Sequence, residues 1–351
     1  MTPFESDIEA QPEALARVLG HYQGEGAAEL AAAAELAAGA SSVVLVGMGS
    51  SRSASLPVAT TIGRRLPALV AEAGELLHYG LASIGADQMV VLTSQSGRSV
   101  ETVAVAEELA RRGHPRILAV TNDLASPLAT HARLTLPILA GDEATVATKT
   151  WTTTFAVLAR LADAIVAGGM PHDADGDASP DILAALASVA ADGGVADAAA
   201  SAMLACAALA VVGRGPAYAA ADYGALILKE TAALPAEAFA GGSFRHGPLE
   251  IAGPDVGVVV LAPSGPTHDL CVRLAADTAS LGSPTWLITD GGAPAPTTAD
   301  RTQVTTLPAV DEAWSPVTMS VPIQRLAAAL ARERGRVPGT LLRSQKVTDR
   351  E

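Results

Sequence analysis

Short apolar runs alternate with longer stretches of helical character along most of this chain. The first apolar run covers residues 42–46, and similar runs return at 68–73, 88–92, 116–121 and 134–139. Helical periodicity lies between them, for example at 100–112. Strands that are continuously apolar and separated by helices are typical of a parallel sheet covered on both faces. The pattern therefore predicts an α/β fold with a doubly wound parallel sheet.

The same alternation starts again in the second half of the chain. Strands are predicted at 207–212, 256–262, 285–289 and 303–307, with helices around 217–231, 268–280 and 317–334. Residues 171–180 separate the two series and are rich in Asp, Gly and Pro, which is typical of a linker. Two copies of one architecture explain this repeat better than one long sheet does.

These patterns predict the limits of the domains. With 351 residues, the chain is long enough for two domains or one large one. We expect an N-terminal helical arm at 1–38, a first sheet domain at 39–170, a linker and helix at 171–195, a second sheet domain at 196–335 and a tail at 336–351. The tail is polar, and we expect it to cover the active site.

The charge of the chain limits the class of its partners. The formal net charge is −14, and Lys and Arg form no run. Nucleic-acid binding is therefore not expected, because it depends on a basic face. An anionic substrate would have to be held by backbone N–H groups and hydroxyl groups.

Several further features indicate a cytoplasmic protein without a metal or cofactor. The first twenty residues have no apolar core of a signal peptide, and no apolar run approaches the length of a membrane span. Cys206 and Cys271 lie in apolar contexts, which favours buried, reduced thiols over a disulfide or a metal pair. The seven histidines show no ligand spacing, so we expect no metal site.

Two serine-rich turns follow predicted strands of the first series. One is Gly49-Ser50-Ser51, and the other is Ser94-Gln-Ser-Gly-Arg-Ser99. Each stands at the carboxyl end of a strand and at the start of a helix, where backbone N–H groups point outward and suit a phosphate. The alternative for the second turn is an ordinary N-cap, with Ser99 closing the helix that starts at Val100.

Acid–base groups appear in the second series. A helix-like run from 217 ends in Lys229 and Glu230, and an irregular segment with Gly and Pro then leads to His246. A carboxylate and an imidazole in one cleft could move protons. The alternatives are a solvated carboxylate at Glu230 and a turn-capping histidine. Likewise, residues 148–154 either contact substrate or only cap the helix that they open.

Together these motifs resemble the SIS (sugar isomerase) family. This family includes the isomerase half of glucosamine-fructose-6-phosphate aminotransferase, aminosugar-phosphate deaminases, aldose-ketose isomerases and deglycases. The resemblance spans most of the chain from about Val43 onward and is carried by Ser94-Gln-Ser-Gly97, Thr148-Lys149, Gly213-Arg-Gly215, Lys229-Glu230, Phe244-Arg-His-Gly-Pro248 and Lys346-Val-Thr348. It implies two tandem SIS domains.

The resemblance also implies roles for individual residues. Phosphate contacts would come from Ser51, Ser94, Gln95, Ser96 and Ser99, and further substrate contacts from Gly49, Ser50, Thr148 and Lys149. Glu230 would be the base that moves a proton between C1 and C2 of the sugar. His246, supplied by the neighbouring subunit of a homodimer, would open the sugar ring. Lys346 would match the lysine that forms an imine with the open-chain sugar in the aminotransferase.

Two departures from the aminotransferase pattern affect the expected reaction. No glutaminase domain and no cysteine near Met1 precede the first strand, so we expect no transfer of ammonia from glutamine by this chain alone. Ile227 stands where the aminotransferase carries a lysine.

The resemblance leaves three functions open. The first is an isomerase and deaminase of an aminosugar 6-phosphate. The second is a deglycase of a phosphorylated fructosyl-amine, and the third is a sugar-phosphate sensor without catalysis. The absence of a DNA-binding segment, together with Glu230, His246 and Lys346, argues against the sensor.

Overall fold

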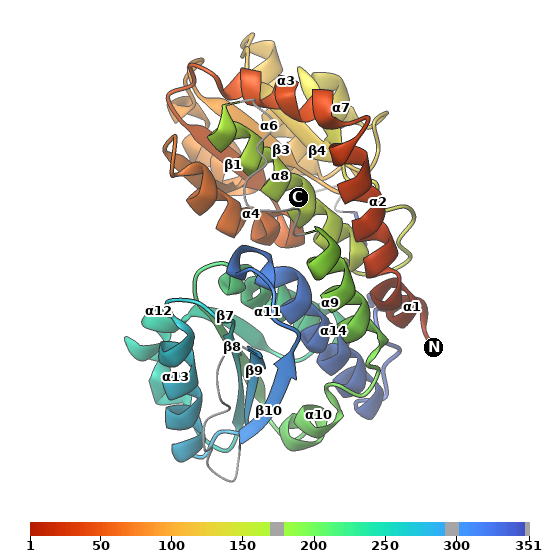
Figure 1. Cartoon of the computed structure of the whole chain (residues 1–351), viewed down its shortest axis with the longest axis vertical. Coiled ribbons are helices and arrows are strands. Elements are labelled where there is room, and N and C mark those ends of the chain that lie inside the picture. The colour runs from red at the N-terminus through yellow and green to blue at the C-terminus, as the bar shows by residue number, and fades with distance from the viewer. Residues whose placement is uncertain (169–178, 292–301, 348–351) are drawn as a thin grey trace. The chain divides into compact units, whose positions relative to one another are not determined.

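The computed structural model describes residues 1–168, 179–291 and 302–347, and within them the chain forms two five-stranded parallel sheets (Figure 1). Each sheet belongs to a separate compact unit. The first-sheet unit contains residues 13–143, 149–168 and 343–347, and the second-sheet unit contains 1–12, 144–148, 179–291 and 302–342. The prediction of an α/β fold with two tandem domains of parallel strands is confirmed.

The first sheet has the strand order β2-β1-β3-β4-β5. Its three inner strands, β1, β3 and β4, are buried along their whole length, which is why continuous apolar runs mark them in the sequence. The bounds are Val43–Gly47 (β1), Ala68–Glu72 (β2), Met89–Thr93 (β3), Ile117–Thr121 (β4) and Leu134–Pro137 (β5).

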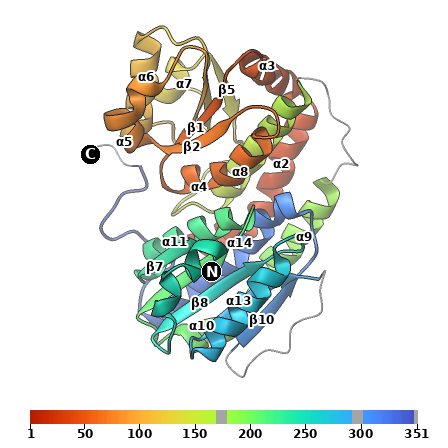
Figure 2. The same cartoon turned by 90° about the vertical axis from the view of Figure 1, so that its left-hand side faces the viewer.

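Helices cover both faces of the first sheet (Figures 1 and 2). One face carries α3 (Ala27–Ala37), α4 (Gly49–Ile62) and α8 (Lys149–Ala167), and the other carries α6 (Val100–Arg111) and α7 (Pro127–His131). Alternate strand residues such as Val44, Val46, Val90 and Leu92 pack with Val105 and Leu109 of α6. Because successive side chains of a strand point to opposite faces of the sheet, the continuously apolar strands form a hydrophobic core on both faces.

The second sheet has the order β10-β9-β8-β6-β7, which is the order of the first sheet with β6 to β10 in place of β1 to β5. The bounds are Ala208–Gly213 (β6), Ala236–Ala240 (β7), Val256–Ala262 (β8), Thr285–Asp290 (β9) and Thr302–Leu307 (β10). All neighbouring strands are parallel, as in the first sheet. The repeat in the sequence is thus a repeat of topology.

The helices of the second sheet also form two layers (Figure 2). α13 (His268–Ser280) packs on β8 and β9, and α11 (Ala217–Ala232) packs on β6 and β7 and against α14 (Ser315–Glu333). Gly224 allows the close approach of α11 to α14, because a Cβ there would lie 2.8 Å from Ile323 Cδ1. The remaining helices of this unit include α9 (Ser179–Ala191), α10 (Asp197–Met203) and α12 (Gly241–Arg245).

The N-terminal segment divides between the two units. α1 (Pro3–Glu9) begins with a capping box between Thr2 and Glu5 and lies in the second-sheet unit, whereas α2 (Gln11–Gln23) lies mostly in the first. Gln11 is fully buried, and its Nε2 donates to Gln324 Oε1 of α14 over 2.8 Å. This hydrogen bond satisfies two buried amides within the second-sheet unit.

Two expectations need correction, and two others lie largely or wholly outside the described residues. The turn expected at Gly49-Ser50-Ser51 is the first turn of a helix, because α4 already begins at Gly49. The irregular segment expected after Glu230 contains strand β7 and helix α12. The linker expected at 171–180 and the end of the tail, 348–351, fall largely or wholly outside the described residues.

The structure agrees with the prediction that both cysteines are buried, reduced thiols. Cys206 and Cys271 are buried free thiols, and burial raises the pKa of Cys271 to about 11. Among the helices of the described residues, none is both long and apolar enough to cross a membrane.

Candidate active site

Two serine-rich turns leave the first sheet next to each other. The register of β1 and β3 pairs Gly47 with Thr93, the last residue of each strand. The turns that follow, residues 48–52 and 94–99, therefore emerge at the same carboxyl edge. The strand order reverses between β1 and β3, and such a switch point is where doubly wound sheets bind their ligands.

The hydroxyl groups of the second turn hold it in one conformation. Ser94 is 3% exposed, and its Oγ lies 3.1 Å from Ser99 Oγ. The Arg98 backbone N–H donates to Ser96 Oγ over 3.2 Å. Ser99 is the N-cap residue of α6, but its side chain makes no capping hydrogen bond. The alternative of an ordinary side-chain cap therefore does not describe this turn.

Gly97 is the position of this turn at which a side chain does not fit. Its φ angle is +62°, in the left-handed region that favours glycine. A Cβ at this position would lie 2.1 Å from Ser126 Oγ and 3.0 Å from Thr121 Oγ1. The turn is thus packed closely against the residues that follow β4.

A narrow hollow of about 10 Å³, the room of about one water molecule, opens beside the two turns. Thr150 and Thr154 of α8 stand four residues apart and share one face of that helix. Trp151 Nε1 donates to Ser53 Oγ over 2.9 Å, which fixes α8 against α4. The hollow is lined by Ser50, Ser51, Gln95, Thr150, Trp151 and Thr154. Predicted contact residues from both turns are thus brought together, and the other wall comes from residues 150, 151 and 154 of α8, which lie within the predicted segment 148–154.

The lining of this hollow suits an anion without supplying a basic side chain. Arg98 points to Asp123, with 2.9 Å between Nη2 and Oδ2. The Ala125 N–H and Arg98 hold the pKa of Asp123 below its ordinary value. What remains for a ligand are hydroxyl groups and the N-termini of α4 and α6, which attract negative charge.

The corresponding turn of the second sheet is occupied by carboxylates. The Ser264 N–H donates to Asp290 Oδ1 over 2.8 Å, and Ser264 Oγ donates to the same atom. Glu312 lies against Gly265, where a Cβ would be 2.5 Å from its carboxyl carbon. Burial, Asp311 and Asp290 raise the pKa of Glu312. This edge would repel a phosphate, so the first sheet is the better anion site.

Glu230 lies in the last turn of α11, two residues before the helix ends at Ala232. It is half-buried, whereas Lys229 beside it is exposed. A carboxylate at the C-terminal end of a helix opposes the helix dipole, so helix stability does not explain Glu230. Ile227, about one turn earlier, is fully buried in the core.

His246 follows α12 and is exposed. The helix before it is anchored by Phe244, which is fully buried and packs edge-on against Phe239, with ring centroids 5.1 Å apart. Gly247, with φ of +118°, turns the chain directly after the histidine. The backbone next to His246 is therefore anchored, while its imidazole is open to solvent on this chain.

Lys346 contacts a residue that was not predicted. Its Nζ donates to Glu143 Oε2 over 3.2 Å and also to the Glu143 backbone oxygen. Glu143 lies just before α8, and a carboxylate near a helix N-terminus was the one signal that could have pointed to it. Both residues belong to the first-sheet unit, as do the serine turns.

The other predicted contact residues take different positions. Gly49 is the first residue of α4 and has φ of +47°. Lys149 is the first residue of α8 and is half-buried. Thr148 is fully buried and belongs to the second-sheet unit. Of these three residues, none lines the hollow.

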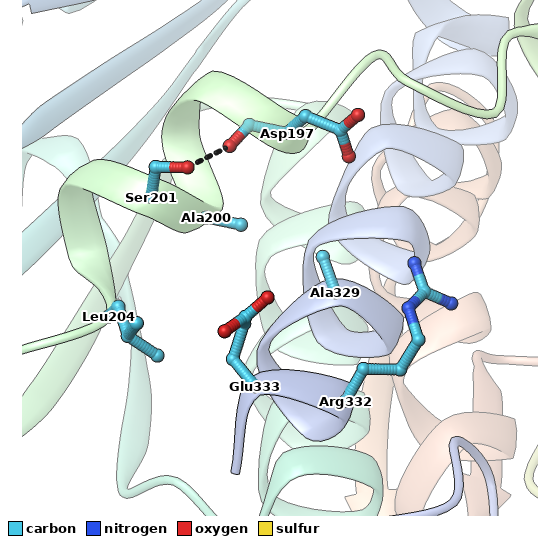
Figure 3. A pocket seen from close by; sticks show the side chains of 7 residues that line it. All are labelled: Asp197, Ala200, Ser201, Leu204, Ala329, Arg332 and Glu333. Atoms are coloured by element: carbon cyan, nitrogen blue, oxygen red, sulfur yellow. Dashed lines mark hydrogen bonds between the residues drawn. The ribbon is translucent and has the colours of Figure 1, made fainter. Parts of the chain in front are cut away.

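A second hollow, of about 430 Å³, lies between α10 and the end of α14 (Figure 3). Asp197 and Glu333 contribute carboxylates to its wall, and Arg332 is paired with Glu5. Ser201 Oγ donates to the Asp197 backbone oxygen over 3.0 Å. With two acids and one neutralised base, this hollow does not suit a phosphate.

Comparison of this sequence with known proteins identifies one family in both halves of the chain. Residues 37–164 and 203–331 both match the SIS domain family. A glutamine–fructose-6-phosphate aminotransferase of Zymomonas mobilis is 32% identical over 297 residues, which cover 82% of this chain and 49% of the relative. The chain thus spans about half the length of this relative, and it covers 55% of one from Rhizobium meliloti that is 30% identical.

Solved structures share the whole fold. The C-terminal domain of glucosamine-fructose-6-phosphate aminotransferase from Francisella tularensis superposes with a TM-score of 0.84 at 22% identity, covering 96% of this chain and 97% of that domain. A glucosamine-6-phosphate deaminase from Thermotoga maritima gives 0.77 at 19% identity and covers 99% of both chains. At these identities the likeness concerns the fold.

Proposed function

Because the chain belongs to the SIS domain family, we propose that it is an isomerase and deaminase of an aminosugar 6-phosphate. The reaction would convert a substrate such as glucosamine 6-phosphate and water into fructose 6-phosphate and ammonia. It proceeds by ring opening and by proton transfer between C1 and C2.

The observation that carries this proposal is the pair of serine turns at the switch point of the first sheet. Ser50, Ser51 and Gln95 line one hollow, and the Ser94 and Ser99 hydroxyl groups lie 3.1 Å apart beside it. Hydroxyl groups and helix N-termini are the donors that a phosphate monoester needs when no basic side chain is at hand.

Glu230 is the base of the proposed mechanism. It takes the proton from one of the two carbons and returns it to the other, while the phosphate keeps the open-chain sugar in place. Its half-buried position in the last turn of α11 supports this role, because partial burial favours the neutral form of a carboxyl group and so makes its carboxylate a stronger base.

His246 opens the sugar ring in this proposal, and a second copy of the chain supplies it. Its exposure on its own chain, together with the buried anchor Phe244, supports a histidine that is offered to another subunit. The proposed active form is therefore a homodimer.

The fully buried Ile227 supports deamination over the amino-transfer named for the relatives. A lysine at this position would place an ammonium in an apolar core, at a large cost in solvation. The chain spans about half the length of those relatives.

The proposal is tested by incubating the protein with glucosamine 6-phosphate, galactosamine 6-phosphate and a fructosyl-amine 6-phosphate. Released ammonia or amine is measured, with unphosphorylated glucosamine as the control. We expect ammonia from an aminosugar 6-phosphate and none from glucosamine. Release of amine from the fructosyl-amine alone would identify a deglycase. Tight binding without any turnover would identify a sensor.

A further inference from the structure

Glu143 is a buried carboxylate that joins three parts of the first-sheet unit. Its side chain is 0% exposed. Oε1 accepts from the Thr150 N–H over 3.1 Å, and Oε2 accepts from Thr150 Oγ1 over 2.6 Å. The same Oε2 accepts from Lys346 Nζ over 3.2 Å. One carboxylate therefore caps the start of α8 and binds the tail lysine.

These contacts compensate for the burial of the charge. An ionised carboxylate removed from water is costly unless charged or hydrogen-bonding partners surround it. Thr150 supplies two donors, the N-terminus of α8 supplies a favourable dipole, and Lys346 supplies the opposite charge. Lys346 is the only one of these partners that comes from a distant part of the chain and could leave.

The position of Thr150 connects this cluster to the candidate active site. Thr150 lines the hollow together with Ser50, Ser51 and Gln95. The carboxylate that holds Lys346 therefore also holds a residue of the hollow's wall. A lysine on a flexible four-carbon stem has high rotamer entropy, so a fixed partner is needed to keep its amine at one place.

We propose that Glu143 is a positioning residue that holds the amine of Lys346, and with it the tail, beside the serine-lined hollow. The chemical use of that amine, an imine with the open-chain sugar, rests on the proposed function. The contact by which Glu143 positions the amine does not depend on the proposed function. Without the carboxylate, Lys346 loses its anionic partner and its amine leaves Glu143 for part of the time.

The test measures the reactivity of the Lys346 amine in the ligand-free protein. Parent and Glu143→Gln are treated briefly with N-hydroxysuccinimidyl acetate at neutral pH, and acetylation of each lysine is read by peptide mass spectrometry. Loss of a charge-assisted hydrogen bond predicts about three- to tenfold faster labelling of Lys346 in the variant. Equal labelling of Lys346 in the two folded proteins would overturn the proposal.

A matched control separates this effect from a general loss of stability. Glu108→Gln removes a carboxylate that pairs with Arg111 and Arg112 on the surface of the same unit, and it should leave Lys346 labelling unchanged. Should Glu143→Gln not fold, Lys346→Met provides the second test. Trypsin should then cleave after Arg343 faster than in the parent, and unchanged cleavage would contradict the proposal.

Activity gives a separate readout. If the proposed function holds, Glu143→Gln lowers kcat more than it raises the Kd for inorganic phosphate, because the serine turns remain. A parent protein without any turnover would defeat the proposed function but leave the labelling result intact. Failure of one proposal is thus distinguishable from failure of the other.

Discussion

Single hydroxyl groups of the serine turns should each contribute to phosphate affinity. Ser94 and Ser96 lie in the turn that follows β3, and Ser94 is buried beside Ser99. Replacing either with Ala removes a charge-assisted hydrogen bond, at a cost of roughly 1.5–3 kcal/mol. Calorimetric titration with the sugar phosphate should show binding weakened by about tenfold or more for each variant. Unchanged affinity would place the phosphate elsewhere.

Gly97 offers a prediction about the turn that does not depend on the ligand. Gly97→Ala combines a positive φ with a Cβ that would lie 2.1 Å from Ser126 Oγ. Gly113→Ala is the matched control, because its φ is +70° but a Cβ meets nothing within 4 Å. Thermal unfolding should show a loss of roughly 1 kcal/mol for Gly113→Ala and of about 2–4 kcal/mol for Gly97→Ala. Equal losses would mean that the turn relaxes freely.

At the scale of elements, the helical turn Glu312–Trp314 before α14 predicts a pH dependence. Burial, Asp311 and Asp290 raise the pKa of Glu312 in the folded chain. The stability that this group contributes is therefore fully present below the ordinary pKa of 4.5 and is lost as the pH rises through the raised pKa. Glu312→Gln removes the charge.

The measurement for Glu312 is the melting temperature of parent and variant between pH 4 and pH 7. Relative to the parent, Glu312→Gln should gain stability as the pH rises across this range. A constant difference in melting temperature would show that the carboxylate is not strained by its neighbours in the folded state.

The sequence predicted the inner elements well, for a physical reason. β1, β3 and β8 are apolar on both faces, so their runs in the sequence differ from the strands by a residue or two at most. β7 was missed because an edge strand with one neighbour tolerates the mixed sequence Ala-Glu-Ala-Phe-Ala. The early start of α4 was missed because Gly, Ser and Ser read as a turn.

The site was predictable only where its residues are local in the sequence. The serine turns follow strands directly, so topology alone brings them to one edge. Glu143 was missed because its role depends on its contact with Lys346, which lies 203 positions away in the sequence. Residues 148–154 were predicted as possible substrate contacts, but which of them line the hollow depends on how α8 packs against α4.

At the scale of the whole molecule, the proposed homodimer predicts complementation between inactive variants. If His246 acts in the neighbouring subunit, a heterodimer of Glu230→Gln and His246→Ala has one site with both native residues. The subunits must be dissociated and reassembled before ammonia release is measured. Activity should then return in the mixture.

The reciprocal heterodimer is the control. Paired with a parent subunit, the double variant Glu230→Gln/His246→Ala should have no working site if His246 crosses between subunits. If both residues act within one chain, this heterodimer keeps one working site and the first mixture stays inactive. The two mixtures thus give opposite results under the two arrangements.

We propose that Glu230 makes this chain an enzyme and not a sugar-phosphate sensor. The most direct measurement compares ammonia release and substrate binding for the parent and Glu230→Gln, because glutamine keeps the size of the side chain and loses the base. We predict that the variant binds the aminosugar 6-phosphate like the parent but turns over roughly two to four orders of magnitude more slowly. Near-parent turnover by Glu230→Gln would show that Glu230 is not the base.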